Sequence, residues 1–303
     1  MSYDRDMIGY GDEPPRVNWP GGARVAVQFV LNYEEGGENC VLHGDAASET
    51  FLSEIIGAQA FEDARHMSLE SIYEFGSRAG VWRILDLFSD QQVPLTVFAV
   101  AMAAERNPAV IERALKDGHE IASHGLRWID YHHVDEHDER VHIHQAAERI
   151  QRLTGIKPVG WMTGRPGPNT RRLLVEHGGF HYDRDALNDE LPYWVTVGGM
   201  PHLVIPYSYE TNDNRCDQSN GFAQSDDFFQ YMRDAFDLLH EEGADRPGLL
   251  SIGLHDRLIG RPARAVGLIK LLEYMQDKGD VWFCSGADIA SHWRKTHPYQ
   301  APA

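Results

Sequence analysis

The stretch Arg24-Val25-Ala26-Val27-Gln28-Phe29-Val30-Leu31 is rich in β-forming residues and almost continuously apolar, and it runs directly into Asn32-Tyr33-Glu34-Glu35-Gly36. Such a run is typical of a strand buried on both faces, as in a parallel sheet covered by helices. Two adjacent carboxylates at the end of this strand repel each other, so at least one needs a cation, a proton or a hydrogen-bond donor. One of them could act as a general base towards water, and the alternative is a solvated acidic turn before Gly36-Gly37.

Strand and helix patterns alternate downstream of this stretch. Asn107 can cap a helix, and Pro108 fits its first turn. Further strands are expected at residues 95–100, 120–123, 159–162, 202–205, 249–254 and 281–284, and helices at 81–90, 107–118, 135–153, 169–177, 225–239 and 263–278. The alternation predicts one parallel α/β domain over residues 1–303, a barrel of about seven strands, with residues 1–20 as an N-terminal extension.

Polar, titratable residues follow four of the predicted strands. They are Glu34, His124, Arg165 and His255. Active sites of parallel α/β domains form at the carboxyl ends of the strands, so we expect these side chains to meet in one site.

Each of these residues has a catalytic and a structural interpretation. Arg165, between Gly164 and Pro166, could hold a carboxylate ionised through a bidentate contact, or form a structural ion pair. His255 could protonate a leaving nitrogen, although a lone histidine after a strand is more often structural. Asp256 could orient a neighbour or face solvent.

An aromatic loop follows His124. Trp128 could form the wall of a pocket for a small planar substrate, or simply pack in the core. Further candidates for substrate contacts are Trp161, Tyr193, Glu210 and Asn212. The histidines at 132, 133, 137, 142 and 144 flank a helix start among many acids, which indicates a solvated face rather than a metal site. Neither a serine or cysteine nucleophile motif nor a glycine-rich phosphate loop is present.

Composition limits the partners. The formal net charge is −18 and no Lys/Arg-rich run occurs, which argues against nucleic acid and anionic membranes. No stretch approaches the roughly 20 apolar residues of a membrane span, and the polar N-terminus lacks the apolar core of a signal peptide. Cys40, Cys216 and Cys284 are widely spaced and form no CxxC pattern, so we expect a reduced, cytoplasmic protein.

Four ordered motifs resemble those of the polysaccharide deacetylase (NodB homology) superfamily. An acidic pair after a strand matches Glu34-Glu35, an Arg-Pro loop matches Arg165-Pro166, and a strand-end Leu-His matches Leu254-His255. The His-x-x-x-His metal pair is matched at His124 and broken by Trp128. Within the superfamily the chain is most similar to the cofactor-independent allantoinases. This resemblance is carried by residues 31–38, 73–80, 127–131, 164–170 and 258–262 and extends from about residue 4 to residue 298.

The resemblance implies a distorted (β/α) barrel, a homotetramer, and hydrolytic opening of a small cyclic ureide, allantoin to allantoate in purine degradation, without metal or cofactor. It gives Glu34 the acid–base position, Glu35 and His124 the positions of metal ligands, and His255 the role of general acid. Residues 209–216 follow the allantoinase pattern only in part, and Asp256 stands where a small or neutral residue is expected. Both departures leave cyclic imides open as substrates.

Two other classes of function remain as alternatives. A metal-dependent deacetylase acting on a sugar polymer or peptidoglycan would need a third ligand besides Glu35 and His124, such as His132 or His133. A binding protein would have kept the pocket and lost turnover. The acids, Arg165 and His255 argue against the binding protein.

Overall fold

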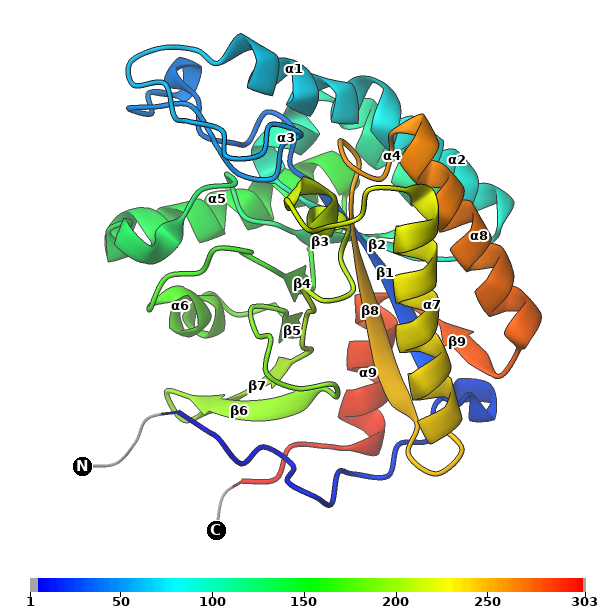
Figure 1. Cartoon of the computed structure of the whole chain (residues 1–303). Helices are drawn as coiled ribbons and strands as arrows, with labels where there is room; N and C mark the ends of the chain where they lie inside the picture. The colour runs from blue at the N-terminus through cyan, green and yellow to red at the C-terminus, as the bar shows by residue number, and fades with distance from the viewer. Residues whose placement is uncertain (1–4, 302–303) are drawn as a thin grey trace.

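A curled nine-stranded sheet forms the centre of the computed structural model, which describes residues 5–301. The strand order is β6-β7-β5-β4-β3-β2-β1-β8, with β9 beside the start of β1 (Figure 1). The strands are β1 (Val25–Tyr33), β2 (Leu95–Ala99), β3 (Glu120–Ser123), β4 (Gly160–Trp161), β5 (Tyr182–Asp183), β6 (Tyr193–Val197), β7 (Met200–Val204), β8 (Gly248–His255) and β9 (Val281–Phe283). All pairings are parallel except β6 with β7, and the half-barrel confirms the predicted distorted (β/α) barrel.

Helices alternate with most of these strands. They are α1 (Met67–Phe75), α2 (Val81–Asp90), α3 (Ala101–Arg106), α4 (Pro108–Lys116), α5 (Glu136–Thr154), α6 (Thr170–His177), α7 (Ser225–Glu242), α8 (Pro262–Lys278) and α9 (Gly286–Thr296). Short helical turns are η1 (Pro20–Gly22), η2 (Val41–His43), the π-helical η3 (Gly76–Gly80), η4 (Tyr131–His133) and η5 (Asp213–Asp217). The predicted elements appear within a few residues of their expected bounds, whereas α1, α3, α9, β5 and β6 were not predicted. Asp135 caps α5 by accepting from the His137 N–H, whereas α4 begins at Pro108 without the expected capping bond from Asn107, whose side chain donates to Ser77.

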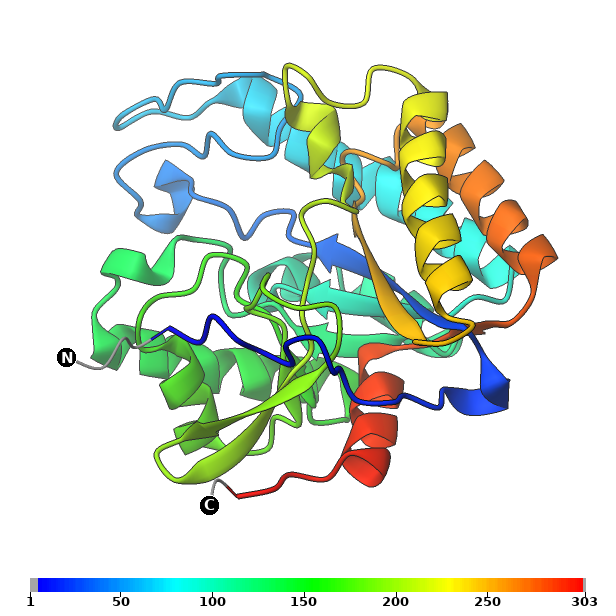
Figure 2. The same cartoon turned by 60° about the horizontal axis from the view of Figure 1, so that its bottom comes forward.

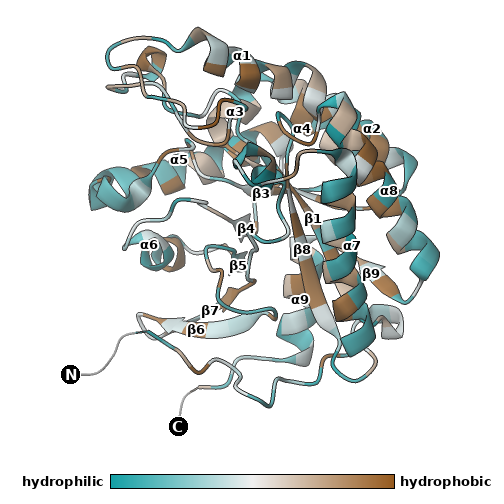
Figure 3. Ribbon diagram, viewed as in Figure 1, coloured by the Kyte–Doolittle hydropathy of each residue, from teal (hydrophilic) through white to brown (hydrophobic). Residues whose placement is uncertain are grey.

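The two faces of β1 pack in different environments. Val27, Phe29 and Leu31 belong to the core beneath α2, α7 and α8, whereas Ala26 and Val30 face the interior of the curled sheet. Figure 3 shows these apolar strands covered by helices whose outer surfaces are hydrophilic. Burial on both faces is therefore the reason that the run is apolar at consecutive positions.

The N-terminal segment and α9 close the bottom of the half-barrel, where the strands begin (Figure 2). Trp19 lies 6.1 Å from Trp293 of α9, measured between ring centroids, and its Nε1 donates to the Gly248 carbonyl at 2.8 Å. Of the expected N-terminal extension, residues 1–4 lie outside the described residues. Within residues 5–301, no helix combines the length and the apolar character needed to cross a bilayer.

The strand register brings distant loops to one rim. Asn32 of β1 pairs with His255 of β8, and Tyr33 pairs with Ala99, the last residue of β2. The ladder continues through Ser123 and Trp161 to Asp183 at the end of β5. The loops after β1, β3, β4, β5 and β8 therefore meet at the carboxyl edge of the sheet, where ligand sites of such folds form.

Candidate active site

Glu34 lies at the centre of this edge and is buried. Its Oε1 lies 3.1 Å from His124 Nε2 and 3.7 Å from His255 Nε2, and its Oε2 accepts from Arg257 Nη2 at 2.6 Å. Burial alone would raise the pKa of this carboxyl, but Arg257 and the two imidazoles outweigh burial and lower the pKa to about 2. Glu34 is thus ionised at neutral pH, with two imidazoles on one of its oxygens.

Arg257 is the cation that holds the acidic pair. It donates to Glu34 and, through Nη1 at 2.9 Å, to Glu35, and its Nε donates to the Leu52 carbonyl. Its guanidinium is buried between the rings of Tyr73, at 4.3 Å, and Trp128, at 5.4 Å. Arg257 thus bridges the two acids, whereas Arg165, for which a bidentate contact to a carboxylate or a structural ion pair was considered, forms an ion pair with Glu49. The sequence signal for Arg257 was its place two residues after His255, at the end of β8.

Glu35 points away from the two histidines and towards a second buried acid. Its Oε2 accepts from the Glu34 N–H at 2.8 Å, and its Oε1 contacts Arg257. Burial and the charge of Glu35 raise the pKa of Asp256 well above its usual range. Asp256 is buried beside Glu35 and its Oδ1 accepts from the Arg257 N–H, so it does not face solvent, and of the two outcomes considered for it, orienting a neighbour describes its place. A side chain at Gly76 would meet oxygens of both acids, which explains the glycine at the start of η3.

His255 is oriented by an aspartate that the sequence reading had not singled out. Its Nδ1 donates to Asp213 Oδ1 at 2.6 Å, while Asp213 Oδ2 accepts from the backbone N–H groups of His255 and Ile259. Asp213 is fully buried at the start of η5. An imidazole held in this way presents Nε2 to the reaction centre and is stabilised when it carries a second proton.

His124 is fixed by a backbone group. Its Nδ1 donates to the Met162 carbonyl at 2.7 Å, because a carbonyl oxygen can only accept. Its Nε2 therefore faces Glu34, and both histidines direct the same ring nitrogen at one carboxylate oxygen.

Trp128 and Arg165 form a layer beside this cluster. The Arg165 guanidinium lies 4.0 Å from the centre of the Trp128 ring and donates to the Trp128 carbonyl and to Glu49. Phe51 stacks on the same ring system, and Trp128 is only 2% exposed. The faces of this ring are therefore occupied within the protein, and Trp128 does not offer the flat substrate wall that was expected.

Four candidates for substrate contacts lie elsewhere or are otherwise engaged. Trp161 packs on Phe180 in the core beneath α5 and α6, and Tyr193, the first residue of the antiparallel edge strand β6, donates to Asn188. Glu210 is exposed and contacts Tyr231. Asn212 is buried and caps η5, so it positions Asp213 instead of reaching a ligand.

The donor set does not fit a metal ion. Glu35 is paired with a guanidinium, and position 128 carries an indole in place of an imidazole. Among residues 5–301, no three or more His, Cys, Asp and Glu side chains are grouped as a metal site requires.

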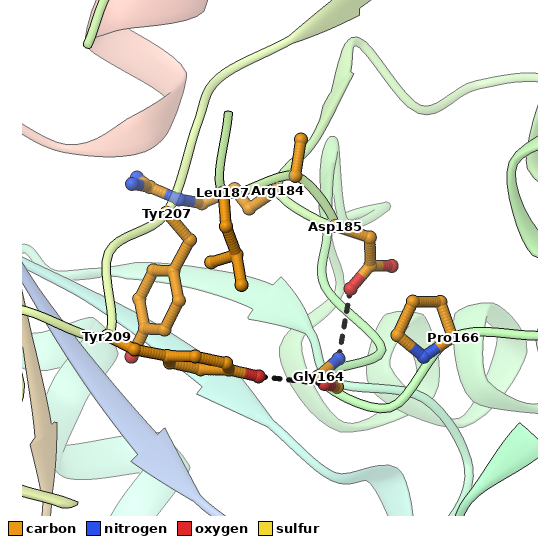
Figure 4. Close-up of a pocket in the computed structure, with 8 residues that line it drawn as sticks. Gly164, Pro166, Arg184, Asp185, Leu187, Tyr207 and Tyr209 are labelled. Atoms are coloured by element: carbon orange, nitrogen blue, oxygen red, sulfur yellow. Dashed lines mark hydrogen bonds between the residues drawn. The ribbon is translucent and has the colours of Figure 1, made fainter. Parts of the chain in front are cut away.

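A recess lies at the loops that follow β4 and β5 (Figure 4), and one of its lining residues, Gly164, lies beside His124. It has a volume of about 270 Å³ and is lined by Gly164, Pro166, Arg184, Asp185, Ala186, Leu187, Tyr207 and Tyr209. Tyr209 is 49% exposed, and its hydroxyl donates to the Gly164 carbonyl. The recess is at the small end of ligand pockets, so it suits a small molecule.

Comparisons with known proteins match the chain to one family. A model of the polysaccharide deacetylase family matches residues 63–177, which include His124, Trp128 and Arg165. A Schizosaccharomyces pombe protein assigned to the polysaccharide deacetylases is 42% identical over 321 residues, covering 99% of this chain and 100% of that protein.

Two solved structures are closely similar. One is a probable polysaccharide deacetylase from Pseudomonas aeruginosa PAO1, with a TM-score of 0.96 and 60% identity, covering 98% of this chain and 100% of that one. The other is the PuuE allantoinase, with a TM-score of 0.97 and 58% identity, covering 99% and 100%.

Proposed function

Because the chain belongs to the polysaccharide deacetylase family, we propose that it is a hydrolase of the allantoinase type, which opens the ring of a small cyclic ureide, allantoin, to allantoate. The observation that carries the proposal is the convergence of His124 and His255 on one oxygen of Glu34, whose other oxygen is held by Arg257. The identity of 58% with an allantoinase over 99% of the chain supports the choice of substrate.

In the proposed mechanism, water attacks a ring carbonyl and its proton goes to Glu34. His255 gives its Nε2 proton to the departing ring nitrogen, and His124, with a proton on both ring nitrogens, donates from Nε2 to the oxyanion. The proton transfer to Glu34 and the proton transfer from His255 assist each other. A carboxyl with a pKa near 2 is a weak base, and the charge of His255 is one cause of that low value. When His255 loses its proton, Glu34 becomes the stronger base, and the proton on Glu34 can then return to His255 across 3.7 Å.

The rest of the machinery would act without a bound cofactor. Arg257 holds Glu34 through the oxygen that the histidines do not contact and also holds Glu35, and Asp213 keeps His255 in the required tautomer. The same site could act on cyclic imides, because the bond broken is again a ring C–N bond.

The second candidate is a deacetylase of sugar polymers or peptidoglycan, which the family model and the yeast relative favour by name. Turnover on allantoin, hydantoin, succinimide and a chitooligosaccharide separates the candidates. Ring opening of allantoin at the highest kcat/KM is the expected result. Faster turnover of succinimide would make the protein a cyclic imide hydrolase, and acetate release from the oligosaccharide would overturn the proposal.

We also propose that the protein is a cytoplasmic homotetramer. All three cysteines are free, which fits a reducing compartment. Large apolar side chains are exposed along the segment that joins β1 to α1, at Leu42, Phe51, Ile56, Phe61 and Met67. An exposed apolar group of this kind is typical of a subunit interface, and light scattering coupled to gel filtration measures the expected mass of four chains.

A further inference from the structure

The recess beside the acid–base cluster has a polar floor and apolar walls (Figure 4). Leu187, Pro166 and the rings of Tyr207 and Tyr209 line it, and Gly164 lies between Tyr209 and the carboxylate of Asp185, with a hydrogen bond to each. Asp185 is not part of the mechanism described above, so its role in this position is unassigned.

The Asp185 carboxylate can accept at least one further hydrogen bond. Oδ1 accepts from the N–H groups of Thr163 and Gly164, and Oδ2 accepts from Thr163, whereas a carboxylate offers about four lone-pair sites. Among residues 5–301, no Lys, Arg or His forms a salt bridge with it. The neighbouring Arg184 is turned behind Tyr207, where it donates to Pro206 and Ser251 (Figure 4). A partly buried carboxylate without a cation favours a ligand that brings N–H donors.

A single residue separates this carboxylate from the reaction centre. Gly164 donates to Asp185 Oδ1 at 3.0 Å, and a side chain at Gly164 would lie 3.1 Å from the His124 ring. A molecule with its ring at Glu34 and His124 could therefore extend past Gly164 into the recess.

We propose that this recess is a subsite for an N–H-rich arm of the substrate, a ureido group, whose N–H donors are accepted by Asp185 beside the rings of Tyr207 and Tyr209. The proposal rests on the proposed function, because it assumes that a cyclic ureide ring is bound at Glu34. It makes Asp185 a determinant of specificity: a ring that carries a ureido arm uses the recess, and a bare ring does not.

The test compares a substrate with the arm to a ligand without it. For wild type and Asp185→Asn, kcat/KM is measured on allantoin, and hydantoin, the same ring without the arm, is measured as a competitive inhibitor. The amide keeps an acceptor for the Thr163 and Gly164 N–H groups, so the loop should remain folded. We expect kcat/KM on allantoin to fall about tenfold or more, mainly through KM, while the Ki of hydantoin stays within twofold.

Two further variants serve as a second test of the recess and as a matched control. Leu187→Trp, at a position 55% exposed, fills the recess without changing the carboxylate and should weaken allantoin binding while leaving hydantoin unaffected. Asp189→Asn, an acid of the same loop that does not line the recess, should change neither constant. Equal losses for allantoin and hydantoin, or no loss for either, would overturn the subsite alone. A wild-type protein that does not hydrolyse allantoin would overturn the proposed function as well.

Discussion

Replacing Asp213 by asparagine exchanges one carboxylate oxygen for an NH2 group and leaves the shape of the side chain almost unchanged. In the native protein Asp213 accepts from His255 Nδ1 at 2.6 Å and from two backbone N–H groups at 2.7 and 3.2 Å. Asparagine can keep the backbone contacts through its single carbonyl oxygen. Its NH2 group then faces Nδ1, which forces Nδ1 to become an acceptor and leaves a doubly protonated His255 without its partner.

The magnitude follows from that lost contact. A hydrogen bond to a charged group contributes about 1.5–3 kcal/mol, and each 1.36 kcal/mol is a factor of ten in rate. The lost bond alone therefore predicts a fall in kcat of about 10- to 150-fold. The clash of two N–H donors when His255 is protonated adds to it, so we expect a total of about 10²–10³.

The assay is steady-state hydrolysis of allantoin between pH 6 and 9, combined with thermal unfolding of each variant. We expect kcat to fall, KM to change little, and Tm to stay within a few degrees, because the backbone contacts of Asp213 persist. Asp217→Asn, on the same helix η5, is the matched control, since its carboxylate bonds Ser53 and not His255. A folded Asp213→Asn protein with kcat within threefold of wild type would refute the role of Asp213 as the residue that orients His255.

Three further predictions concern the buried acids and the absence of a metal requirement. Glu34→Gln should lower kcat by about 10² or more, whereas Glu35→Gln should retain more activity, because Glu35 faces Arg257 and not the histidines; equal kcat values would contradict this assignment. Exhaustive chelation should leave kcat unchanged, and a loss restored by Zn²⁺ would contradict the role of Arg257. Burial raises the pKa of Glu38 to about 7 and that of Asp217 to about 6. Because these folded-state values exceed the unfolded ones, the associated stability is present in acid and is lost as pH rises through 6 to 7. The change in Tm from pH 8 to pH 5.5 should therefore be less favourable in Glu38→Gln than in wild type; equal changes in the two proteins would count against it.

The pattern of apolar and polar residues along the chain was sufficient to predict the elements whose burial follows a regular repeat. The consecutive apolar residues of β1 indicated a strand buried on both faces, and Glu34, His124 and His255 were found because each directly follows such a strand. A helix start such as Asn107-Pro108 is likewise set by adjacent residues. The elements that were missed lack this signal: β5 is two residues long, and β6 pairs antiparallel to β7.

Which side chains touch was decided by the tertiary structure. Arg165 and Arg257 both follow strand ends, and only the sheet register places Arg257, more than two hundred residues away in the chain, against Glu34 and Glu35. Asp213 reaches His255 because η5 lies over the end of β8. Trp128 was correctly located near His124, but packing against Arg165 and Phe51 covers its ring, whereas Tyr209, beside the recess, is about half exposed. Sequence thus determined which chemical groups reach the edge of the sheet. The partners of those groups depend on contacts between distant segments, which exist only once the sheet has formed and fixed its register.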